Sequence, residues 1–302
     1  MNGANIKKVL IAGGSGFIGS VLTKQLQKDG FETCLISRMP RPNSITWDDL
    51  NQNGIPERTD AVINVAGQNV LDPTRRWTPG FKQNVIASRV HTNQMLVNVI
   101  NQCDSHQKPK VFVSISGVGY YRPDPNQIYD EYSTGGDHDF LSKLCTDWEK
   151  ASKVEGDQTR NVIVRSGIVL GKNGGIIQQM YPLFFLGLGS KIGSGTQHMP
   201  WIHIEDICNI FIQALINDKF AGVINGVAPE IVTNDQFTKT FARLLWRPSF
   251  LFIPEQIIEF VFSSERAVMM TRGQKVISKR MEELGVHIKH PTVEEALKDI
   301  LK

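Results

Sequence analysis

The sequence predicts an α/β protein built on a Rossmann-type doubly wound parallel sheet, followed by a smaller and mainly helical C-terminal portion. Strand-like apolar runs alternate with helix-like segments through the first half of the 302-residue chain, which is typical of parallel sheets. The runs are almost continuously apolar, as expected when helices cover both faces of a sheet. A glycine-rich turn also joins the first run to the first helix, and such a turn opens many nucleotide-binding sheets.

Five apolar runs are the expected strands, and they comprise residues 9–12, 33–37, 61–66, 111–116 and 162–170. A covering helix is expected over residues 139–152, where the apolar residues share one face. We therefore divide the chain into a nucleotide-binding core, residues 1–170, and a substrate-side portion, residues 171–302. Some strands of the second portion are expected to return to the core sheet.

The composition is that of a globular protein without a nucleic-acid-binding surface. Lys and Arg total 33 against 30 Asp and Glu, so the net charge of +3 provides no broad basic field. The four cysteines are far apart and indicate neither a disulfide framework nor a metal site. The first strand starts too early for a signal peptide, and no apolar run is long enough to span a bilayer. We expect a soluble intracellular protein without a membrane partner, with the cytoplasm as first choice and other compartments left open.

Residues 9–19 have the pattern of a dinucleotide-binding turn: an apolar strand, three spaced glycines and the start of a helix. We expect Gly13 to allow the tight turn, Gly16 to let the backbone approach the phosphates, and Gly19 to let the helix pack closely. Free N–H groups at the start of the helix favour an anion there. The expected contacts to the pyrophosphate come from Gly13, Gly16, Phe17, Ile18 and Gly19. An ordinary glycine-rich turn is the alternative interpretation.

The end of the second strand indicates which nicotinamide cofactor binds. An acidic residue there would accept hydrogen bonds from the ribose 2′-hydroxyl of NAD, but the strand ends with Ser37 and Arg38, and Arg41 follows. A guanidinium at this position can make paired, charge-assisted hydrogen bonds to a 2′-phosphate. We therefore predict NADP as the cofactor. The alternative is that Arg38 is a solvated loop residue.

Further segments make the chain resemble an extended short-chain dehydrogenase/reductase of the atypical, nucleoside-diphosphate-sugar epimerase-like branch. They are spread over nearly the full length, and several are specific to this branch. They include Asn64-Val65-Ala66-Gly67, Ser88-Arg89, Asp147-Trp148-Glu149, Val164-Arg165-Ser166-Gly167 and Trp201-Ile202-His203-Ile204-Glu205-Asp206.

The resemblance implies that NADP lies across the strand ends. The residues implied to contact it are those at 16–18, Ser37, Arg38, Val65, Ala66, Arg89 and Val169. Spacing alone does not single out Arg89 from its neighbours. Many relatives dimerise through helices that flank the sheet, which leaves a homodimer open, although we find no exposed apolar stripe in the sequence that requires one.

The chain departs from the family pattern in its chemistry. Active members of the wider superfamily use a Tyr, and a Lys four residues later, to exchange a proton with the substrate, but no Tyr-x-x-x-Lys occurs in this sequence. Leu141 and Cys145 stand at these two positions. Ser116 matches the substrate-polarising residue, and Tyr120 or Tyr121 is the candidate proton donor. The alternatives are a Ser116 hydroxyl satisfied by nearby backbone and tyrosines that form only a pocket wall.

Other polar residues have mainly structural interpretations. His203 is expected to hold a loop rather than to act as a base. His287 and His290 have no further ligand beside them in the sequence, so we predict no metal site. The segment Arg75-Arg76-Trp77 is expected either to hold an anionic substrate or to form a salt-bridged surface loop.

Three functional hypotheses follow. The first is an NADP-dependent oxidoreductase acting on a small molecule, in which Ser116 polarises a carbonyl and the cofactor carries the reaction. The second is epimerisation of a nucleotide-linked sugar, which the missing Tyr–Lys pair weakens most. The third is a non-catalytic NADP-binding protein that reports the cofactor's level or redox state to a partner, and it accounts for the missing pair directly. The sequence does not identify the substrate.

Overall fold

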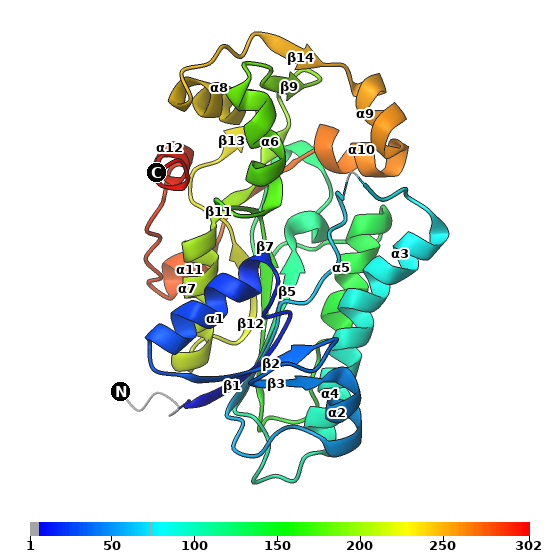
Figure 1. Cartoon of the computed structure of the whole chain (residues 1–302), viewed down its shortest axis with the longest axis vertical. Helices are drawn as coiled ribbons and strands as arrows, with labels where there is room; N and C mark the ends of the chain where they lie inside the picture. Colours follow the sequence, from blue (N-terminus) through cyan, green and yellow to red (C-terminus); the bar gives the residue numbers. More distant parts are fainter. Residues whose placement is uncertain (1–5, 73) are drawn as a thin grey trace.

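A seven-stranded parallel sheet forms the centre of the computed structural model (Figure 1), which describes residues 6–72 and 74–302. The strand order is β12-β7-β5-β4-β1-β2-β3, and each neighbouring pair is parallel. In chain order the strands are β1 (Lys8–Ala12), β2 (Glu32–Ser37), β3 (Ser44–Thr46), β4 (Ala61–Asn64), β5 (Val111–Gly117), β7 (Arg160–Ser166) and β12 (Gly222–Gly226). The predicted fold class is confirmed. The strand order reverses direction between β1 and β4, where doubly wound sheets bind their ligands.

Helices cover both faces of this sheet, because the side chains of its strands alternate between two apolar layers. Val9 and Ile11 of β1 share one buried cluster with Leu22 and Phe211, whereas Leu10 lies in another cluster with residues of α4. Figure 1 shows α1 and α7 side by side on one face and α3, α4 and α5 on the other. These helices are α1 (Phe17–Lys28), α2 (Trp47–Asn53, beside α4), α3 (Pro79–Ile86), α4 (Thr92–Gln102), α5 (Phe140–Lys150) and α7 (Ile204–Ile216).

The last expected strand of the core is interrupted. The apolar run predicted over 162–170 forms β7 and a separate β8 (Ile168–Leu170), which leaves the sheet and pairs with β11 (Trp201–His203). Gly167 makes this change of partner possible: a Cβ built on it would lie 2.8 Å from the carbonyl oxygen of Pro200. The N–H of Ile168 donates to that same oxygen over 2.8 Å. An apolar run alone does not show where a strand changes partner.

The remaining elements form the upper part of the molecule in Figure 1 and its C-terminal edge. Three small two-stranded sheets, β10–β13, β14–β9 and β15–β6, connect them. The strands are β6 (Asp124–Tyr129), β9 (Ser190–Ile192), β10 (His198–Met199), β13 (Val232–Thr233), β14 (Leu251–Ile253) and β15 (Gln274–Val276). The helices are α6 (Gly175–Phe185), α8 (Asn234–Leu244), α9 (Glu255–Phe262), α10 (Ser264–Thr271), α11 (Lys279–Glu283) and α12 (Val293–Ile300).

The chain returns to the core after residue 171. Both α7 and β12 belong to the central sheet and its cover, so the division at residue 170 stays a prediction about function rather than a break in the fold. Across the described ranges, the structure contains no helix with the length and apolar character needed to cross a membrane.

Candidate dinucleotide-binding site

The glycine turn after β1 lies at the carboxyl end of the sheet. Gly13 has φ +79°, and a Cβ built on it would lie 2.6 Å from the backbone nitrogen of Ala66 at the end of β4. A Cβ on Gly19 would lie 2.1 Å from the carbonyl oxygen of Gly13, so α1 can approach the turn only with glycine there. Gly16 is different, because its Cβ would meet only the oxygen of Gly13, at 3.2 Å. The space above Gly16 is therefore open to a ligand.

The first turn of α1 is free to bind an anion. Gly16 is its N-cap, no side chain caps it, and its first turn carries no acidic residue. Within the described residues, the N–H groups of Phe17 and Ile18 have no hydrogen-bond partner. Such N–H groups, together with the positive end of the helix dipole, favour a phosphate.

The ring of Phe17 has a separate structural role. Cβ atoms built on Gly171, Gly174 and Gly175 would lie 2.9, 2.3 and 3.0 Å from this ring, so the ring packs against the backbone of the turn after β8. Any contribution of Phe17 to cofactor binding therefore comes from its N–H. Val169 of β8 lies behind this turn, with its carbonyl oxygen 2.9 Å from a Cβ built on Gly175, and its predicted contact with NADP stays a prediction.

An exposed cation stands at the end of β2. Arg38 is exposed, and neither it nor Arg41 forms an ion pair with any residue that the structure describes. The hydroxyl of Ser37 accepts a hydrogen bond from the N–H of Met39 over 3.3 Å, which shapes the turn that carries Arg38. The guanidinium is thus available to a phosphate on the adenosine ribose.

Val65 and Ala66 are held against the glycine turn by a buried amide pair. The N–H of Val65 donates to the oxygen of Ala12 over 3.0 Å, and the N–H of Ala66 donates to Oδ1 of Asn64 over 3.0 Å. Nδ2 of Asn64 donates to Oδ1 of Asn93 over 2.6 Å, and both asparagines are fully buried. The sequence analysis missed this pair, although an asparagine closing an apolar strand was a visible signal.

Arg89 lies at the same edge of the sheet, in a π-helical turn, Ala87–His91, between α3 and α4. Its Cζ lies 3.2 Å from a Cβ built on Gly67 and 5.1 Å from the centre of the Trp148 ring. Its Nη1 donates to the oxygen of Val85 and the hydroxyl of Ser88, both over 3.3 Å. Burial lowers the pKa of Arg89 to about 10, and none of the described carboxylates pairs with it. A partly buried guanidinium that lacks a carboxylate partner among the described residues is stabilised by binding an anionic ligand.

Ser116, at the end of β5, belongs to a buried charged network that the sequence analysis missed. Its hydroxyl donates to Oε1 of Glu149 over 3.0 Å. Arg165 of β7 donates to both oxygens of Glu149 over 2.7 Å and to the hydroxyl of Tyr121 over 2.8 Å. Burial alone would lower the pKa of Arg165, but Glu149 raises it above its ordinary value. Arg165, a charged residue within an apolar strand, was the feature of the sequence that could have indicated this network.

Tyr121 is not prepared to transfer a proton. Tyr121 is fully buried, and its hydroxyl is within hydrogen-bond distance of the oxygens of Asp130 and Asn225. Burial raises the pKa of Tyr121 to about 12, although Arg165 opposes this shift. The ring of Tyr120 lies under the guanidinium of Arg165, with Cζ 3.5 Å from its centre, and its role as proton donor or as pocket wall stays a prediction.

Leu141 and Cys145, which stand at the helix positions of the missing Tyr and Lys, also provide no acid or base. The side chain of Leu141 packs on Gly119, 2.6 Å from a Cβ built there. Cys145 is buried, and burial raises the pKa of its thiol to about 12, so it stays protonated near neutral pH. Ser116 offers a hydroxyl at the end of β5, but its own proton is directed at Glu149.

The segment Arg75-Arg76-Trp77 lies in the loop after β4, and α10 holds this loop. Arg266 is buried and donates to the carbonyl oxygens of Val70, Asp72 and Arg75 over 2.6–2.9 Å. The indole nitrogen of Trp77 donates to Glu265. The side chains of Arg75 and Arg76 are exposed, so the two alternatives for this segment stay open.

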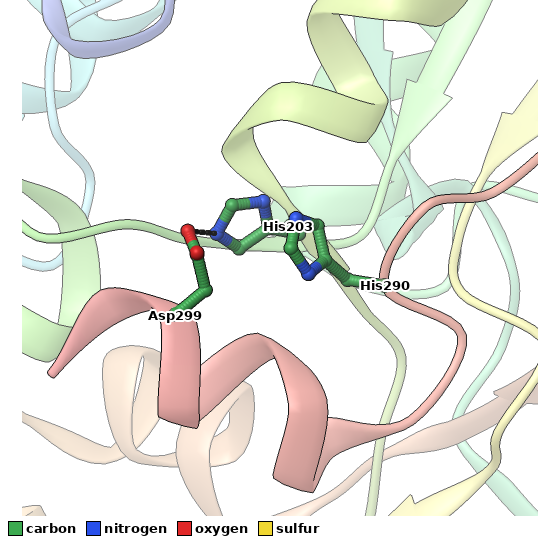
Figure 2. A group of neighbouring side chains, drawn as sticks. All are labelled: His203, His290 and Asp299. Carbon is green, nitrogen blue, oxygen red and sulfur yellow. Dashed lines mark ion pairs between the residues drawn. The ribbon is translucent and has the colours of Figure 1, made fainter. Parts of the chain in front are cut away.

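Figure 2 shows a cluster of His203, His290 and Asp299, in which both histidines are buried. The centres of the two imidazole rings lie 3.9 Å apart. The three side chains can offer ligand atoms within 4.8 Å of one another. However, Nδ1 of His203 accepts the N–H of Glu205 over 3.3 Å, which places the proton of a neutral ring on Nε2, facing Asp299. The ammonium of Lys302 lies 3.4 Å from Asp299. Both features oppose a metal ion there.

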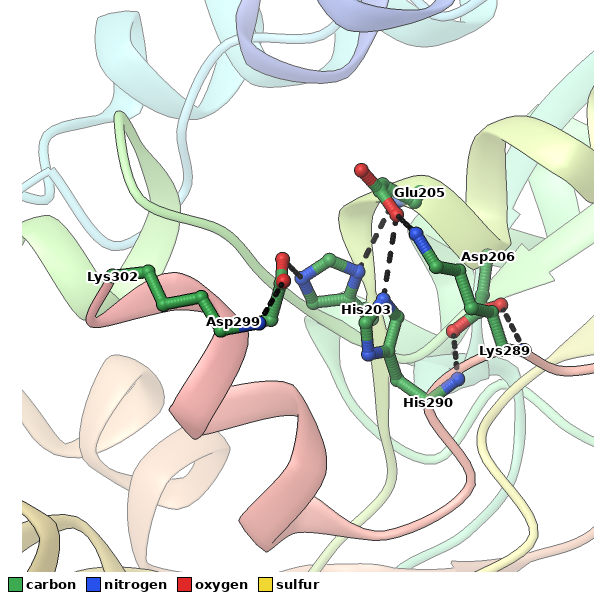
Figure 3. A network of polar contacts seen from close by, with 7 residues as sticks. All are labelled: His203, Glu205, Asp206, Lys289, His290, Asp299 and Lys302. Atoms are coloured by element: carbon green, nitrogen blue, oxygen red, sulfur yellow. Dashed lines mark hydrogen bonds and ion pairs between the residues drawn. The ribbon is translucent and has the colours of Figure 1, made fainter.

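The cluster instead connects three segments of the chain (Figure 3). His203 caps α7, Asp206 accepts the N–H groups of Lys289 and His290 over 2.7 and 3.1 Å, and Asp299 comes from α12. This is the structural role expected of His203. His290 lies in the segment before α12, which Asp206 holds against α7.

Lowering the pH is expected to weaken this cluster. Burial, and then His290, lower the pKa of His203 from 6.5 to about 4, although Glu205 and Asp299 oppose the shift. Below pH 6.5 the imidazole of His203 is therefore protonated in the unfolded chain, whereas in the folded chain it stays neutral down to about pH 4. The stability that the fold gains from a neutral His203 is complete above pH 6.5 and is lost as the pH falls from 6.5 to 4. Between pH 7 and 5 the free energy of unfolding should fall by about 2 kcal/mol through this group.

Urea unfolding of the wild type and of His203→Asn at both pH values measures this effect. Asparagine keeps a side-chain cap on α7 but does not titrate, so the pH-dependent loss should shrink by the stated amount. His106→Asn removes an exposed histidine and should leave the loss unchanged. Equal losses in the wild type and His203→Asn would contradict the assignment.

Comparison with known protein families matches residues 9–225 to the NAD dependent epimerase/dehydratase family. The chain belongs to this family. Residues 253–300 also match a domain of unknown function, DUF1731. The family match covers the central sheet except for the first residue of β1 and the last residue of β12, which agrees with the return of the chain to the core.

Relatives within the family extend over nearly the full chain. The epimerase family protein SDR39U1 of Bos taurus is 46% identical over 295 residues, which cover 97% of this chain and 99% of that protein. The crystal structure of human SDR39U1 (isoform 2) with NADPH has 46% identity and a TM-score of 0.95, covering 97% and 98% of the two chains. A nucleoside-diphosphate sugar epimerase from Corynebacterium glutamicum has 27% identity and a TM-score of 0.77, covering 98% of this chain and 58% of that one. The family resemblance expected from the sequence is thus confirmed.

Proposed function

We propose that this chain binds NADPH across the strand ends and works as an NADPH-dependent oxidoreductase that lacks the Tyr–Lys pair. The observation that carries the proposal is the set of free groups around the glycine turn. These are the uncapped N–H groups of α1, the open space above Gly16, and the guanidiniums of Arg38 and Arg89, which have no carboxylate partner in the described parts of the chain. The human relative crystallised with NADPH supports this choice.

The residues fit a phosphorylated dinucleotide in three places. The first turn of α1 would hold the pyrophosphate, Arg38 the ribose 2′-phosphate, and Val65 and Ala66 the adenosine. Arg89, beside Gly67, would balance negative charge on the cofactor. When bound, NADPH supplies a hydride.

In this proposal Ser116 polarises the carbonyl, and Tyr120 or water supplies the proton. Ser116 lies at the end of β5, but its proton is directed at Glu149. To polarise a carbonyl, the hydroxyl must turn from Glu149 to the substrate, and Glu149 keeps its two bonds from Arg165. The buried Tyr121 and Cys145 hold their protons too tightly to replace it. This arrangement argues against epimerisation, which needs proton exchange in both directions.

The cofactor preference is tested with Arg38→Ala. Loss of a charge-assisted contact to the 2′-phosphate should weaken NADPH binding by about 10- to 100-fold and leave NADH binding unchanged, as measured by titration calorimetry. Arg272→Ala removes an exposed arginine outside the glycine turn and should change neither affinity. A ratio of NADPH to NADH affinity that survives Arg38→Ala would contradict the assignment.

A non-catalytic NADPH-binding protein is the second candidate, and the commitment of the Ser116 proton to Glu149 favours it. Incubating the protein with NADPH and a panel of carbonyl compounds separates the two. Oxidation of NADPH that depends on a carbonyl compound, and that falls in Ser116→Ala, supports the oxidoreductase. Tight binding of NADPH without turnover of any compound supports the non-catalytic protein.

A further inference from the structure

A cation from another part of the chain lies beside the helix position at which this chain lacks the family's lysine. Cys145 of α5 stands at that position, and its Sγ lies 3.5 Å from a Cβ built on Gly117, at the end of β5. Trp148 follows one turn later on the same face of α5. The centre of its ring lies 5.1 Å from Cζ of Arg89. The guanidinium therefore lies against the face of α5 on which the lysine side chain would stand.

The charge of Arg89 acts on the thiol of Cys145. Burial, and then Glu149, raise the pKa of this thiol, whereas the guanidinium of Arg89 opposes the rise. A charge shifts the pKa of another group in this way only at short range. The electrostatic interaction agrees with the geometry, because both indicate positive charge beside position 145.

Part of the guanidinium is free to bind a ligand. Its Nη1 donates to Val85 and Ser88. Nε and Nη2 have no hydrogen-bond partner among the residues that the structure describes, and they lie 3.6 and 3.3 Å from a Cβ built on Gly67. Gly67 directly follows Ala66 and has no side chain to cover them. The free N–H groups thus face the chain just after β4, at the edge of the sheet where ligands bind.

The backbone and a neighbouring ring together fix the position of Arg89. It belongs to the π-helical turn Ala87–His91, and turns of this kind inside helices are frequent at functional sites. The turn joins α3 to α4, on the same face of the sheet as α5 (Figure 1). The indole N–H of Trp148 is buried and has no partner in the described parts of the chain. What Trp148 offers to Arg89 is therefore the face of its ring, which attracts a cation.

The strand order places Arg89 beside the nicotinamide half of the cofactor. In the proposed function, Arg38 on β2 holds the adenosine end, and the first turn of α1 holds the pyrophosphate. Because the strand order is β2-β1-β4-β5, the other half of the cofactor then extends toward the ends of β4 and β5. The nicotinamide ring is positively charged in NADP⁺ and neutral in NADPH. A cation beside this ring repels only the oxidised form.

We propose that Arg89 takes the place of the missing lysine and makes the site selective for the reduced cofactor, NADPH, over NADP⁺. The cation comes from the turn between α3 and α4 instead of from α5. This inference rests on the proposed binding of NADPH, and it applies equally to an oxidoreductase and to a non-catalytic binding protein. Both need to distinguish the reduced cofactor from the oxidised one.

Titration calorimetry with NADPH and with NADP⁺ tests the inference. Arg89→Met keeps a flexible stem against Trp148 but removes the charge, so the ratio of NADPH to NADP⁺ affinity should fall at least about fivefold. Arg89→Lys should retain most of the ratio. Arg38→Ala is the matched control, because both forms carry the 2′-phosphate and should weaken alike. Equal losses of both forms in Arg89→Met would overturn the inference and assign the cation to the phosphates.

Moving the cation back to α5 tests whether Arg89 replaces the lysine. Arg89→Ala/Cys145→Lys should regain the preference for NADPH that Arg89→Ala loses. Arg89→Ala/Thr146→Lys should not regain it, because Thr146 lies on a different part of the helix surface and donates its hydroxyl to Ser142. A Cys145→Lys double variant that fails to recover the preference, although it binds NADPH, would contradict the replacement.

Thermal unfolding without cofactor gives a second measurement. Cys145→Lys places a second buried cation beside Arg89, so it should lower Tm more in the wild-type background than in Arg89→Ala. Equal losses of Tm in the two backgrounds would show that the positions are not in contact, and would overturn the inference. A wild type that binds NADPH and NADP⁺ equally would also overturn it, whereas a wild type that binds neither would contradict the proposed function itself.

Discussion

Replacing Glu149 by leucine is expected to lower the free energy of unfolding by about 3–5 kcal/mol. Glu149 receives two hydrogen bonds from Arg165 and one from Ser116, all within the protein interior. The substitution leaves the buried guanidinium of Arg165 without its counter-charge, and the attraction that had compensated for its lost hydration disappears. Equilibrium unfolding in urea measures the change.

The double variant Glu149→Leu/Arg165→Leu is the informative control. Removing both charges also removes the need to bury them, so this variant should be more stable than Glu149→Leu alone. Glu294→Leu breaks the exposed pair with Arg243 and should change stability much less. If Glu149→Leu unfolds at the same urea concentration as the wild type, the pair does not stabilise the fold as its geometry indicates.

Replacing Gly16 by valine is expected to weaken NADPH binding at least about 100-fold with only a small loss of stability. Gly16 has an extended backbone, φ −77° and ψ −178°, which valine can adopt. Its Cβ meets only the oxygen of Gly13, so the new side chain fits the protein but occupies the space left for the pyrophosphate. Titration calorimetry with NADPH measures the loss, and thermal unfolding reports the stability.

Two other glycines provide matched comparisons. In Gly19→Ala the new Cβ would lie 2.1 Å from the oxygen of Gly13, so both stability and NADPH binding should fall. In Gly80→Ala the Cβ meets nothing within 4 Å, and binding should be unchanged. An affinity of Gly16→Val equal to that of the wild type would place the pyrophosphate elsewhere.

The sequence predicted the central sheet well because parallel strands covered on both faces are continuous apolar runs. It also located the glycine turn, where a positive φ at Gly13 and close approach at Gly19 leave few other residues possible. Both features are local, because each depends on a few consecutive residues. The ends of the strands that carry Arg38, Val65 and Ser116 followed from the same runs.

The features that the sequence did not show depend on partners distant in the chain. The separation of β8 from β7 needs Pro200, and the Glu149–Arg165 pair joins a helix to a strand. In α9, Ile257, Phe260 and Val261 have the i, i+3, i+4 spacing that usually marks a buried helix face, yet all three are exposed. Only the packing of Ile258 shows which side is covered.

The hydrogen bonds from Arg266 to the loop after β4 affect when this loop can fold during synthesis on the ribosome. The carbonyl groups of Val70 and Asp72 find this donor 196 and 194 residues further along the chain. The nucleotide-binding strands can assemble while translation continues. The loop beside them obtains its final shape only after the segment that carries Arg266 has left the exit tunnel, so this loop is among the last parts of the nascent protein to mature.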